Sequence, residues 1–254
     1  MRVVQLSDPH LVASPTGLVR GRPALSHWQR GLKEALLHRP DLLLISGDCC
    51  HDESWNGYAN LRDSLAALPA NTGVAVMPGN HDHPLRLQAA LGRRATLAPA
   101  TLARGQWSLI LLSSHTSGRT DGAVGDQQRR WLAEKLQTAE QEGRFIVIGL
   151  HHPPLRIGEP SWDEIGLRDA ESLQQILGPI KTLRGVLVGH LHQHWQGSLP
   201  RRPDVPVMAC PSTLCAFEAL QPCPLGRAQD PGGRLIDLDS QGSITTSLLR
   251  WPEL

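Results

Sequence analysis

The chain has 254 residues, of which 40% are hydrophobic, and its 25 Lys and Arg residues balance 24 Asp and Glu residues. This length can build one sizeable core, so we expect a single domain over residues 1–254. The neutral charge balance argues against a nucleic-acid partner or a membrane-adsorbing face. The basic residues occur as isolated pairs that are typical of solvated positions, namely Arg93-Arg94, Arg129-Arg130 and Arg201-Arg202.

The chain opens on an apolar run over residues 3–6, without the charged and apolar regions of a secretion signal. No later stretch reaches membrane-spanning length. The odd number of cysteines matches no zinc-ribbon spacing and favours free thiols at Cys49, Cys50, Cys210, Cys215 and Cys223. We therefore expect a cytoplasmic protein without a membrane partner.

Short β-rich apolar runs alternate with segments of helical periodicity. Strands are predicted at residues 3–6, 42–45, 74–77, 109–112, 145–148 and 186–188, and helices at residues 28–37, 58–68, 126–141 and 171–177. Strand, helix and strand in succession predict parallel pairing in a buried sheet.

The last fifty residues differ from the rest. The runs 205–209, 235–238 and 244–249 are predicted to form a β-rich second sheet, and residues 221–233, dense in Pro and Gly, a loop near the mouth of the site. The predicted fold class is α/β, a two-sheet sandwich of mixed sheets flanked by helices.

Five islands of Asp, Asn and His follow predicted strands, and such islands converge because ligand groups gather at the carboxyl ends of strands in open sheets. One island alone is weak evidence for a metal site, whereas five in order predict a pair of metals. The islands are Asp8-Pro9-His10, Gly47-Asp48, Gly79-Asn80-His81-Asp82, His151-His152-Pro153-Pro154 and Gly189-His190-Leu191-His192.

The chemistry of a two-metal site assigns roles within the islands. Asp48, central among them, is the natural bridging carboxylate. Asp8 and His10 are two residues apart on a segment expected to be extended, so they should share one face, and His190 and His192 should repeat that geometry. Oxygen and imidazole ligands without cysteine favour Fe, Mn or Zn. Two carboxylates against two divalent ions leave about +2, which attracts phosphate.

His81 follows Asn80 directly, so its side chain is expected to point away from the metals and toward a phosphoryl group. There it would stabilise transition-state charge or protonate the leaving oxygen. Asp82 is expected to fix the tautomer of His81 as a hydrogen-bond acceptor.

Other aromatic side chains have simpler interpretations. We expect four histidines to be surface or satisfied interior residues: His27, His38, His51 and His115. Three more lie beside the islands, and either a supporting or a purely structural role stays open for them: His83, His152 and His194. A large aromatic ring is more often packing than a base-stacking platform, which applies to Trp28, Trp162 and Trp195.

The pattern D-x-H, G-D, G-N-H-D, H-H-P-P, G-H-x-H resembles the calcineurin-like metallophosphoesterase superfamily. More closely, the chain is similar to the class III cyclic nucleotide phosphodiesterases over roughly residues 1–250. The similarity extends to Ser161-Trp162, Leu167-Arg168-Asp169-Ala170, Gln193 and Pro211-Ser212-Thr213. The chain departs from the family pattern at Pro9 and His83.

The resemblance implies two metal positions. By it, the first metal is held by Asp8, His10, Asp48 and His192, and the second by Asp48, Asn80, His151 and His190. The substrate would contact His10, Asn80, His81 and His192, and the catalytic residues would be His81 and Asp48.

The resemblance also implies hydrolysis of 3′,5′-cyclic AMP to 5′-AMP by a metal-bridging hydroxide. The same site chemistry serves a broader phosphodiesterase acting on glycerophosphodiesters, 2′,3′-cyclic nucleotides or aryl diesters. A non-catalytic scaffold of this fold would lack ligands, and here every ligand position is filled. The oligomeric state stays open.

Overall fold

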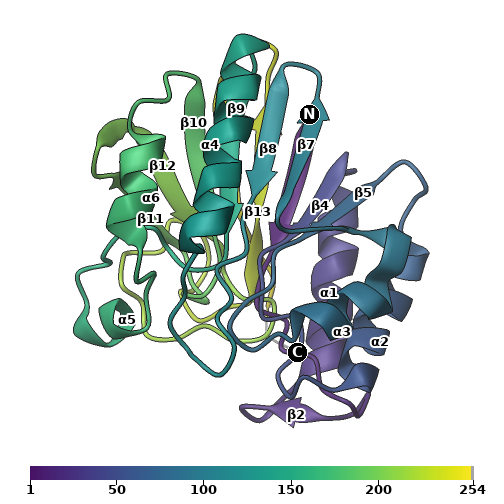
Figure 1. The fold of residues 1–254 in the computed structure, drawn as a ribbon. Helices are drawn as coiled ribbons and strands as arrows, with labels where there is room; N and C mark the ends of the chain where they lie inside the picture. The colour runs from purple at the N-terminus through teal and green to yellow at the C-terminus, as the bar shows by residue number, and fades with distance from the viewer. Residues whose placement is uncertain (253–254) are drawn as a thin grey trace.

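The computed structural model describes residues 1–252 and contains two six-stranded sheets packed face to face (Figure 1). The first sheet has the strand order β14-β13-β1-β4-β5-β6. Its strands are β1 (Arg2–Leu6), β4 (Leu42–Ile45), β5 (Gly73–Val76), β6 (Thr96–Leu97), β13 (Gly232–Leu238) and β14 (Ile244–Arg250). The strands β1, β4, β5 and β6 pair in parallel, whereas β13 and β14 are antiparallel additions.

The second sheet has the order β11-β12-β10-β9-β8-β7. Its strands are β7 (Ala100–Arg104), β8 (Trp107–Leu111), β9 (Phe145–Leu150), β10 (Leu183–Val188), β11 (Trp195–Leu199) and β12 (Arg202–Ala209). The four central strands are parallel, and the edge strands β7 and β11 are antiparallel to their neighbours. A separate hairpin joins β2 (Leu18–Val19) to β3 (Arg22–Pro23).

Helices cover the outer face of each sheet, which gives four layers (Figure 1). The first sheet is covered by α1 (Ala24–Leu37), α2 (Trp55–Ser64) and α3 (Pro84–Leu91), and the second by α4 (Gly125–Gln141) and α6 (Ala170–Leu177). The short α5 (Pro160–Glu164) lies below α6 in this view, and 3₁₀ turns occupy Leu65–Ala67 and Gly92–Arg94.

Strand β4 shows why a continuous apolar run suits this position. Leu42 and Leu44 belong to the core between the sheets, whereas Leu43 and Ile45 belong to the core under the helices. A strand covered on both faces needs apolar side chains at every position rather than at alternate ones. A third core lies between the second sheet and α4 and α6.

The predicted α/β sandwich of mixed sheets is confirmed, with one correction. The C-terminal runs do not form a sheet of their own: β12 joins the second sheet, whereas β13 and β14 extend the first. Their alternating apolar pattern specifies a half-buried strand but not its partner. The predicted loop ends early, because β13 begins at Gly232, and the segment at the site mouth is the earlier one around Cys215.

Several elements were not predicted from the sequence, namely β2, β3, β6, β7, β11, α3 and α5. Most of them are short, so few residues carry the periodic signal. Within the part of the chain that the structure describes, no helix combines the length and apolarity required to cross a bilayer.

Candidate metal centre

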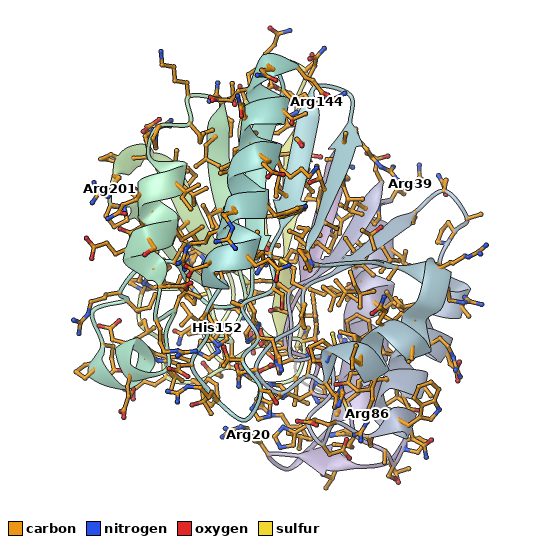
Figure 2. The ribbon with its side chains drawn as sticks, viewed as in Figure 1. Arg20, Arg39, Arg86, Arg144, His152 and Arg201 are labelled. Carbon is orange, nitrogen blue, oxygen red and sulfur yellow. The ribbon has the colours of Figure 1, made fainter. Side chains whose placement is uncertain are left out.

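The five polar islands lie together at the carboxyl ends of parallel strands from both sheets. Asp8, Asp48 and Asn80 follow β1, β4 and β5 of the first sheet, and His151 and His190 follow β9 and β10 of the second. In Figure 2, His152 marks this region in the lower centre of the molecule, where side chains of the two halves meet. The centre therefore spans the junction between the sheets.

Positive backbone φ angles are concentrated in these islands. Of the eight non-glycine residues with positive φ among residues 1–252, five belong to the predicted ligand set: Asp8 (51°), His10 (47°), Asp48 (46°), His190 (68°) and His192 (59°). The expected extended geometry of the two D-x-H and H-x-H segments is therefore wrong, because the chain turns sharply at each ligand. Such backbone conformations are disfavoured for side-chain-bearing residues and cluster at functional sites.

The first half-site contains two imidazoles and two carboxylates. His10 Nε2 lies 3.0 Å from His192 Nε2 and 3.6 Å from Asp48 Oδ2, and His192 Nε2 lies 3.6 Å from Asp8 Oδ1. All four residues offer a ligand atom within 4.8 Å of the others. Bonds of about 2.0–2.2 Å to one ion place neighbouring ligand atoms roughly 3–3.5 Å apart, so this set fits a single cation.

The second half-site lies on the other side of Asp48. His151 Nε2 lies 3.2 Å from Asn80 Oδ1 and 3.6 Å from Asp48 Oδ1, and the rings of His151 and His190 are 5.1 Å apart between centroids. Asp48 thus turns Oδ1 to this half-site and Oδ2 to the first one. A carboxylate in this arrangement can bridge two cations.

Two glycines make this close approach possible. A Cβ added at Gly79 would lie 2.1 Å from Asp48 Oδ1, and one added at Gly47 would lie 2.1 Å from His151 Nδ1. Both distances are far below van der Waals contact, so only glycine fits at either position. Gly47 also has a φ of 101°, which side chains rarely adopt.

In two of the proposed ligand histidines, the ring nitrogen Nδ1 hydrogen-bonds to a backbone carbonyl. His151 Nδ1 donates to the carbonyl oxygen of Ser46 at 2.7 Å, and His192 Nδ1 donates to that of Cys215 at 3.0 Å. Such bonds fix the tautomer that leaves the Nε2 lone pair free for a metal.

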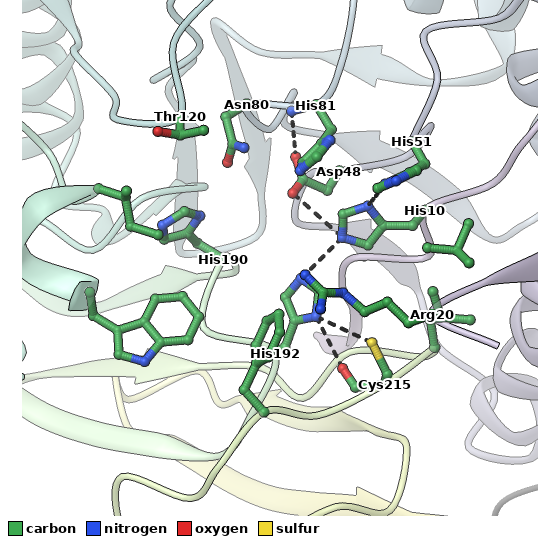
Figure 3. A pocket seen from close by; sticks show the side chains of 15 residues that line it. His10, Arg20, Asp48, His51, Asn80, His81, Thr120, His190, His192 and Cys215 are labelled. Carbon is green, nitrogen blue, oxygen red and sulfur yellow. Dashed lines mark hydrogen bonds and ion pairs between the residues drawn. The ribbon is translucent and has the colours of Figure 1, made fainter. Parts of the chain in front are cut away.

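The other two ligand histidines are supported differently. The imidazole of His190 hydrogen-bonds to the backbone of Ile165, and its Nε2 is buried without a hydrogen-bond partner among the described residues. His10 Nδ1 lies 3.2 Å from Nδ1 of His51 (Figure 3). In each case the remaining nitrogen, Nε2, is available to the cavity.

Burial sets the protonation of the centre. It lowers the pKa of His151 to about 4 and that of His192 to about 3, so these imidazoles are neutral at pH 7, as metal ligands must be. Burial, and then the charge of Asp48, raises the pKa of Asp8 well above its usual value. Two buried carboxylates side by side are costly unless cations compensate them.

The unsatisfied polar atoms of the centre fit a metal pair. Asp8 Oδ1 and His190 Nε2 are both buried without a hydrogen-bond partner among residues 1–252, one in each half-site. Buried polar atoms are almost always satisfied in native proteins, so these two call for an ion. The donors are carboxylate, amide and imidazole, which suit Fe, Mn or Zn.

His152 lies beside His151 and His190, and one ring nitrogen of each of the three lies within 4.8 Å of the others. The Nδ1 atom of His152 lies 2.8 Å from Ser114 Oγ and its Nε2 lies 3.1 Å from the carbonyl oxygen of Thr120. Because both ring nitrogens are already engaged, the structure favours the structural interpretation of this residue.

Three further histidines form hydrogen bonds with residues outside the proposed ligand set: His83 and His194, which lie beside the islands, and His115. His83 accepts a hydrogen bond from Arg86 N at the start of α3, His115 Nδ1 lies 3.0 Å from Gly79 O, and His194 Nδ1 lies 3.2 Å from Arg234 Nη2. Of the three tryptophans considered above as stacking platforms, Trp28 and Trp195 are core residues.

The expected contact between Asp82 and His81 is wrong. Among the described residues, the hydrogen bonds to the buried Asp82 carboxylate come from Gly79 N, Cys49 N, Cys50 N and Tyr58 OH. Asp82 therefore ties the turns that carry Asp48 and Asn80 to each other.

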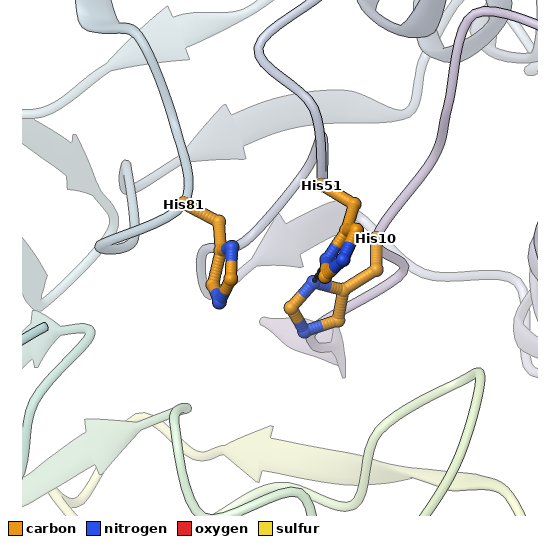
Figure 4. A group of neighbouring side chains, drawn as sticks. All are labelled: His10, His51 and His81. Carbon is orange, nitrogen blue, oxygen red and sulfur yellow. Dashed lines mark hydrogen bonds between the residues drawn. The ribbon is translucent and has the colours of Figure 1, made fainter. Parts of the chain in front are cut away.

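His51 is part of the cavity wall, whereas the sequence analysis expected only a surface or satisfied interior residue. Its ring stacks on that of His81 at 4.9 Å between centroids and meets the ring of His10 at 5.2 Å (Figure 4). His81 also lies 4.9 Å from His10, and its backbone N–H donates to Asp48 Oδ1 at 2.9 Å. His51 follows the proposed ligand Asp48 by three residues, and this proximity is the signal in the sequence that could have indicated its place in the cavity wall.

A two-sheet sandwich with clustered Asp, Asn and His ligands at its strand ends defines the class of metal-dependent phosphoesterases. The chain belongs to the calcineurin-like phosphoesterase family, whose sequence pattern matches residues 1–194.

Known relatives cover almost the whole chain. A probable cyclic nucleotide phosphodiesterase of Synechococcus sp. (strain WH7803) is 51% identical over 98% of this chain and 96% of its own length. The 3′,5′-cyclic adenosine monophosphate phosphodiesterase of Vibrio vulnificus is 30% identical over 98% of this chain and 90% of its own length, and that of Pseudomonas aeruginosa is 31% identical, covering 98% and 89%.

Solved structures share the fold at low sequence identity. A dimetal phosphatase from Danio rerio has a TM-score of 0.67 at 13% identity, covering 100% of this chain and 97% of its own. A purple acid phosphatase from yellow lupin has a TM-score of 0.63 at 16% identity, covering 98% and 51%.

Proposed function

We propose that this chain is a dimetal-dependent phosphodiesterase that hydrolyses 3′,5′-cyclic AMP to 5′-AMP. The observation that carries the proposal is the carboxylate of Asp48, which turns one oxygen to each of two half-sites made of buried neutral imidazoles. The substrate assignment is supported by the relatives that are named for cyclic AMP.

Seven residues would hold two ions of Fe, Mn or Zn. The first ion would take Asp8, His10, Asp48 and His192, and the second Asp48, Asn80, His151 and His190. Ions bound there supply Lewis-acid charge on phosphoryl oxygens and lower the pKa of water that attacks phosphorus.

The chain's own residues orient the substrate and move the proton. His81 lies half-buried on the cavity wall, held there by the bond from its backbone N–H to Asp48, and protonates the departing 3′-oxygen. Substrate phosphate contacts His10, Asn80, His81 and His192, which all line this cavity. The carboxylate of Asp48 would supply a negative charge shared by both ions, because one of its oxygens faces each half-site.

We infer further properties from the same features. Residues 1–254 form one domain, since β13 returns from the C-terminal part of the chain to pair with β1; residues 253–254 lie outside the described residues. A small phosphodiester, rather than nucleic acid or a membrane, is the partner, and five free cysteines suit the cytoplasm.

A substrate panel tests the activity. Protein stripped of metal and reloaded with Mn²⁺ is assayed on 3′,5′-cyclic AMP, 2′,3′-cyclic AMP, a glycerophosphodiester and bis(4-nitrophenyl) phosphate, compared by kcat/KM. We expect the highest value for 3′,5′-cyclic AMP and 5′-AMP as the product. A higher value for any other substrate assigns the chain to the broader phosphodiesterases.

The Asn80→Ala variant tests the metal centre itself. We expect fewer than two Mn²⁺ ions per chain and a kcat/KM lowered by at least about 100-fold, since even residues behind metal ligands cost about 10- to 100-fold. The His38→Ala variant, away from the centre, serves as the control and should keep both. Undiminished metal-dependent turnover by Asn80→Ala contradicts the assignment.

A further inference from the structure

The cavity above the metal centre has a polar floor and a largely apolar rim (Figure 3). Five of the seven proposed ligands line this cavity, and we call them and His81 its floor: His10, Asp48, Asn80, His190 and His192. We call the lining residues Val19, Arg20, Trp162, Leu214 and Phe217 its rim. The cavity volume is about 160 Å³. Sites that bury a whole small molecule usually have at least about 300 Å³, so a nucleotide with its phosphate on the floor must place its planar base at the rim.

Arg20 is the positively charged residue of this rim, and it lies in the turn between β2 and β3. It joins β2 to β3 together with Gly21, with φ angles of 52° and 77° at the two positions. Two-residue hairpin turns of this kind favour Asn, Asp or Gly at the first position, because φ is positive there. Arg20 therefore has a backbone conformation that is disfavoured for a residue with a side chain, as five of the proposed ligand residues do.

The guanidinium of Arg20 is exposed and stacked. Its Cζ lies 4.7 Å from the centroid of the Phe217 ring. Among residues 1–252, no Asp or Glu oxygen lies within 4.0 Å of it, so its charge and its N–H donors remain available. Arg22 anchors the hairpin by donating to Leu214 O at 3.2 Å.

Phe217 connects this cation to the metal centre. Its ring lies 4.6 Å from that of His192 and 5.4 Å from that of Trp162, and Trp162 in turn lies 5.6 Å from His190. Phe217 therefore fixes Arg20 relative to a proposed ligand of the first half-site. The aromatic contacts therefore connect the rim continuously to the floor.

We propose that Arg20, positioned by Phe217, is a specificity-determining residue that binds the base of the nucleotide at the rim of the cavity. The proposal rests on the proposed function, because it assumes that the phosphate lies on the floor. A guanidinium presents a flat face for stacking on a heteroaromatic ring and N–H donors for the acceptors on its edge. A phosphate needs only charge, which the floor supplies.

The test compares three ligands that share a phosphate: inorganic phosphate, ribose 5-phosphate and 5′-AMP. Their dissociation constants are measured by calorimetry on Mn²⁺-loaded protein, so no turnover is needed. Arg20→Ala is expected to weaken 5′-AMP about tenfold, the usual loss for one base-stacking side chain. Phosphate and ribose 5-phosphate should change by less than about twofold.

Two further variants sharpen the result. Arg20→Lys keeps the charge but not the flat face, and it should fall between wild type and Arg20→Ala. Arg39→Ala is the matched control, because Arg39 is also exposed with a positive φ of 49° and lies far from the cavity in Figure 2. With cyclic AMP as substrate, Arg20→Ala should raise KM about tenfold and leave kcat within about twofold.

Equal weakening of all three ligands would mean that Arg20 binds phosphate, and unchanged 5′-AMP binding would mean that it binds nothing; either result overturns the proposal. A wild-type protein that binds ribose 5-phosphate as tightly as 5′-AMP also overturns it. Failure of the proposed function has a different signature, namely no hydrolysis of cyclic AMP by wild type, and the ligand comparison still reports on Arg20 in that case.

Discussion

At the scale of single residues, two of the proposed ligand histidines share one arrangement. His151 and His192 each bind a backbone carbonyl through Nδ1 and turn Nε2 to the cavity. The ring orientation is therefore set by the fold before an ion arrives. Binding then costs little side-chain entropy, which is the usual advantage of a preorganised site.

Asp82 offers a test of how the ligand turns are held. Replacing it by Asn is expected to lower the free energy of unfolding by about 2–3 kcal/mol, because its buried carboxylate accepts backbone N–H bonds from Gly79, Cys49 and Cys50. The measurement is urea unfolding with a chelator present, so that metal binding does not contribute.

Burial, and then Asp48, raises the pKa of Asp82 to about 6, so pH 8 keeps the carboxylate ionised during this measurement. Asp63→Asn, at an exposed position, is the control and should change stability by less than about 0.5 kcal/mol. An equally small change for Asp82→Asn would show that the carboxylate does not hold the turns.

The residues of the centre could be predicted because each ligand type occurs beside a strand end. The structure brings all seven together, although their metal-binding roles remain a proposal. The supporting residues could not be predicted: Ser46 and Cys215 act through backbone carbonyls, which every residue carries. Arg20 and Phe217 are also invisible in the sequence, because nearly 200 residues separate them.

At the scale of elements, β1 is a central strand that pairs with a neighbouring strand on each side. It pairs in parallel with β4 and antiparallel with β13, and Arg2 of β1 forms an ion pair with Asp237 of β13 at 2.9 Å. The hydrogen bond and charge of Arg2 lower the pKa of Asp237. The pair therefore stabilises the protein above the ordinary carboxyl pKa of about 4, and the contribution is lost as pH falls through the lowered value.

We expect Asp237→Asn to lower the free energy of unfolding by only about 0.5 kcal/mol at pH 7, because the side chains are 45% and 43% exposed. The difference from wild type should begin to decrease as pH falls below about 4 and should disappear below the lowered pKa of Asp237. Urea unfolding at pH 7, 5 and 3.5 measures it, with Glu164→Gln as an exposed control. A difference that grows toward low pH would contradict the sign of the shift.

Element prediction succeeded where a run was long and apolar, as for β4, whose bounds match residues 42–45. It failed for α3, although Pro84 at the first turn after His83 is a common start signal. The equally short α6 was predicted, because its apolar residues form a clearer stripe at helical spacing than those of α3. The sequence also could not predict which sheet each C-terminal strand joins. A half-buried strand packs equally well on either sheet, and long-range pairing decides between them.

At the scale of the whole molecule, the metal centre joins the two sheets. Asp8 and Asp48 follow strands of the first sheet, whereas His151 and His190 follow strands of the second. Ions bound there would tie the halves together, so metal binding and global stability are linked.

Metal removal should therefore lower Tm. Free Mn²⁺ at about 100 times its Kd stabilises the native state by about 2.7 kcal/mol per site, which is about 5–10 °C for a chain of this size. Differential scanning calorimetry of chelator-dialysed protein, with and without Mn²⁺, measures the shift. Asp48→Asn is the comparison and should lose most of it. Equal Tm values for wild type with and without Mn²⁺ would mean that no such link exists.

The C-terminal part of the chain supplies several contacts to the residues of the candidate metal centre and to β1. Ser212 Oγ binds the carbonyl oxygen of Asp8, Cys215 O holds His192, and β13 supplies the antiparallel neighbour of β1. A nascent protein still attached to the ribosome just after His192 already carries every proposed ligand but not the backbone that aims them. If the proposed ions bind, these contacts imply that the centre reaches its final geometry only after the C-terminal segment has been released.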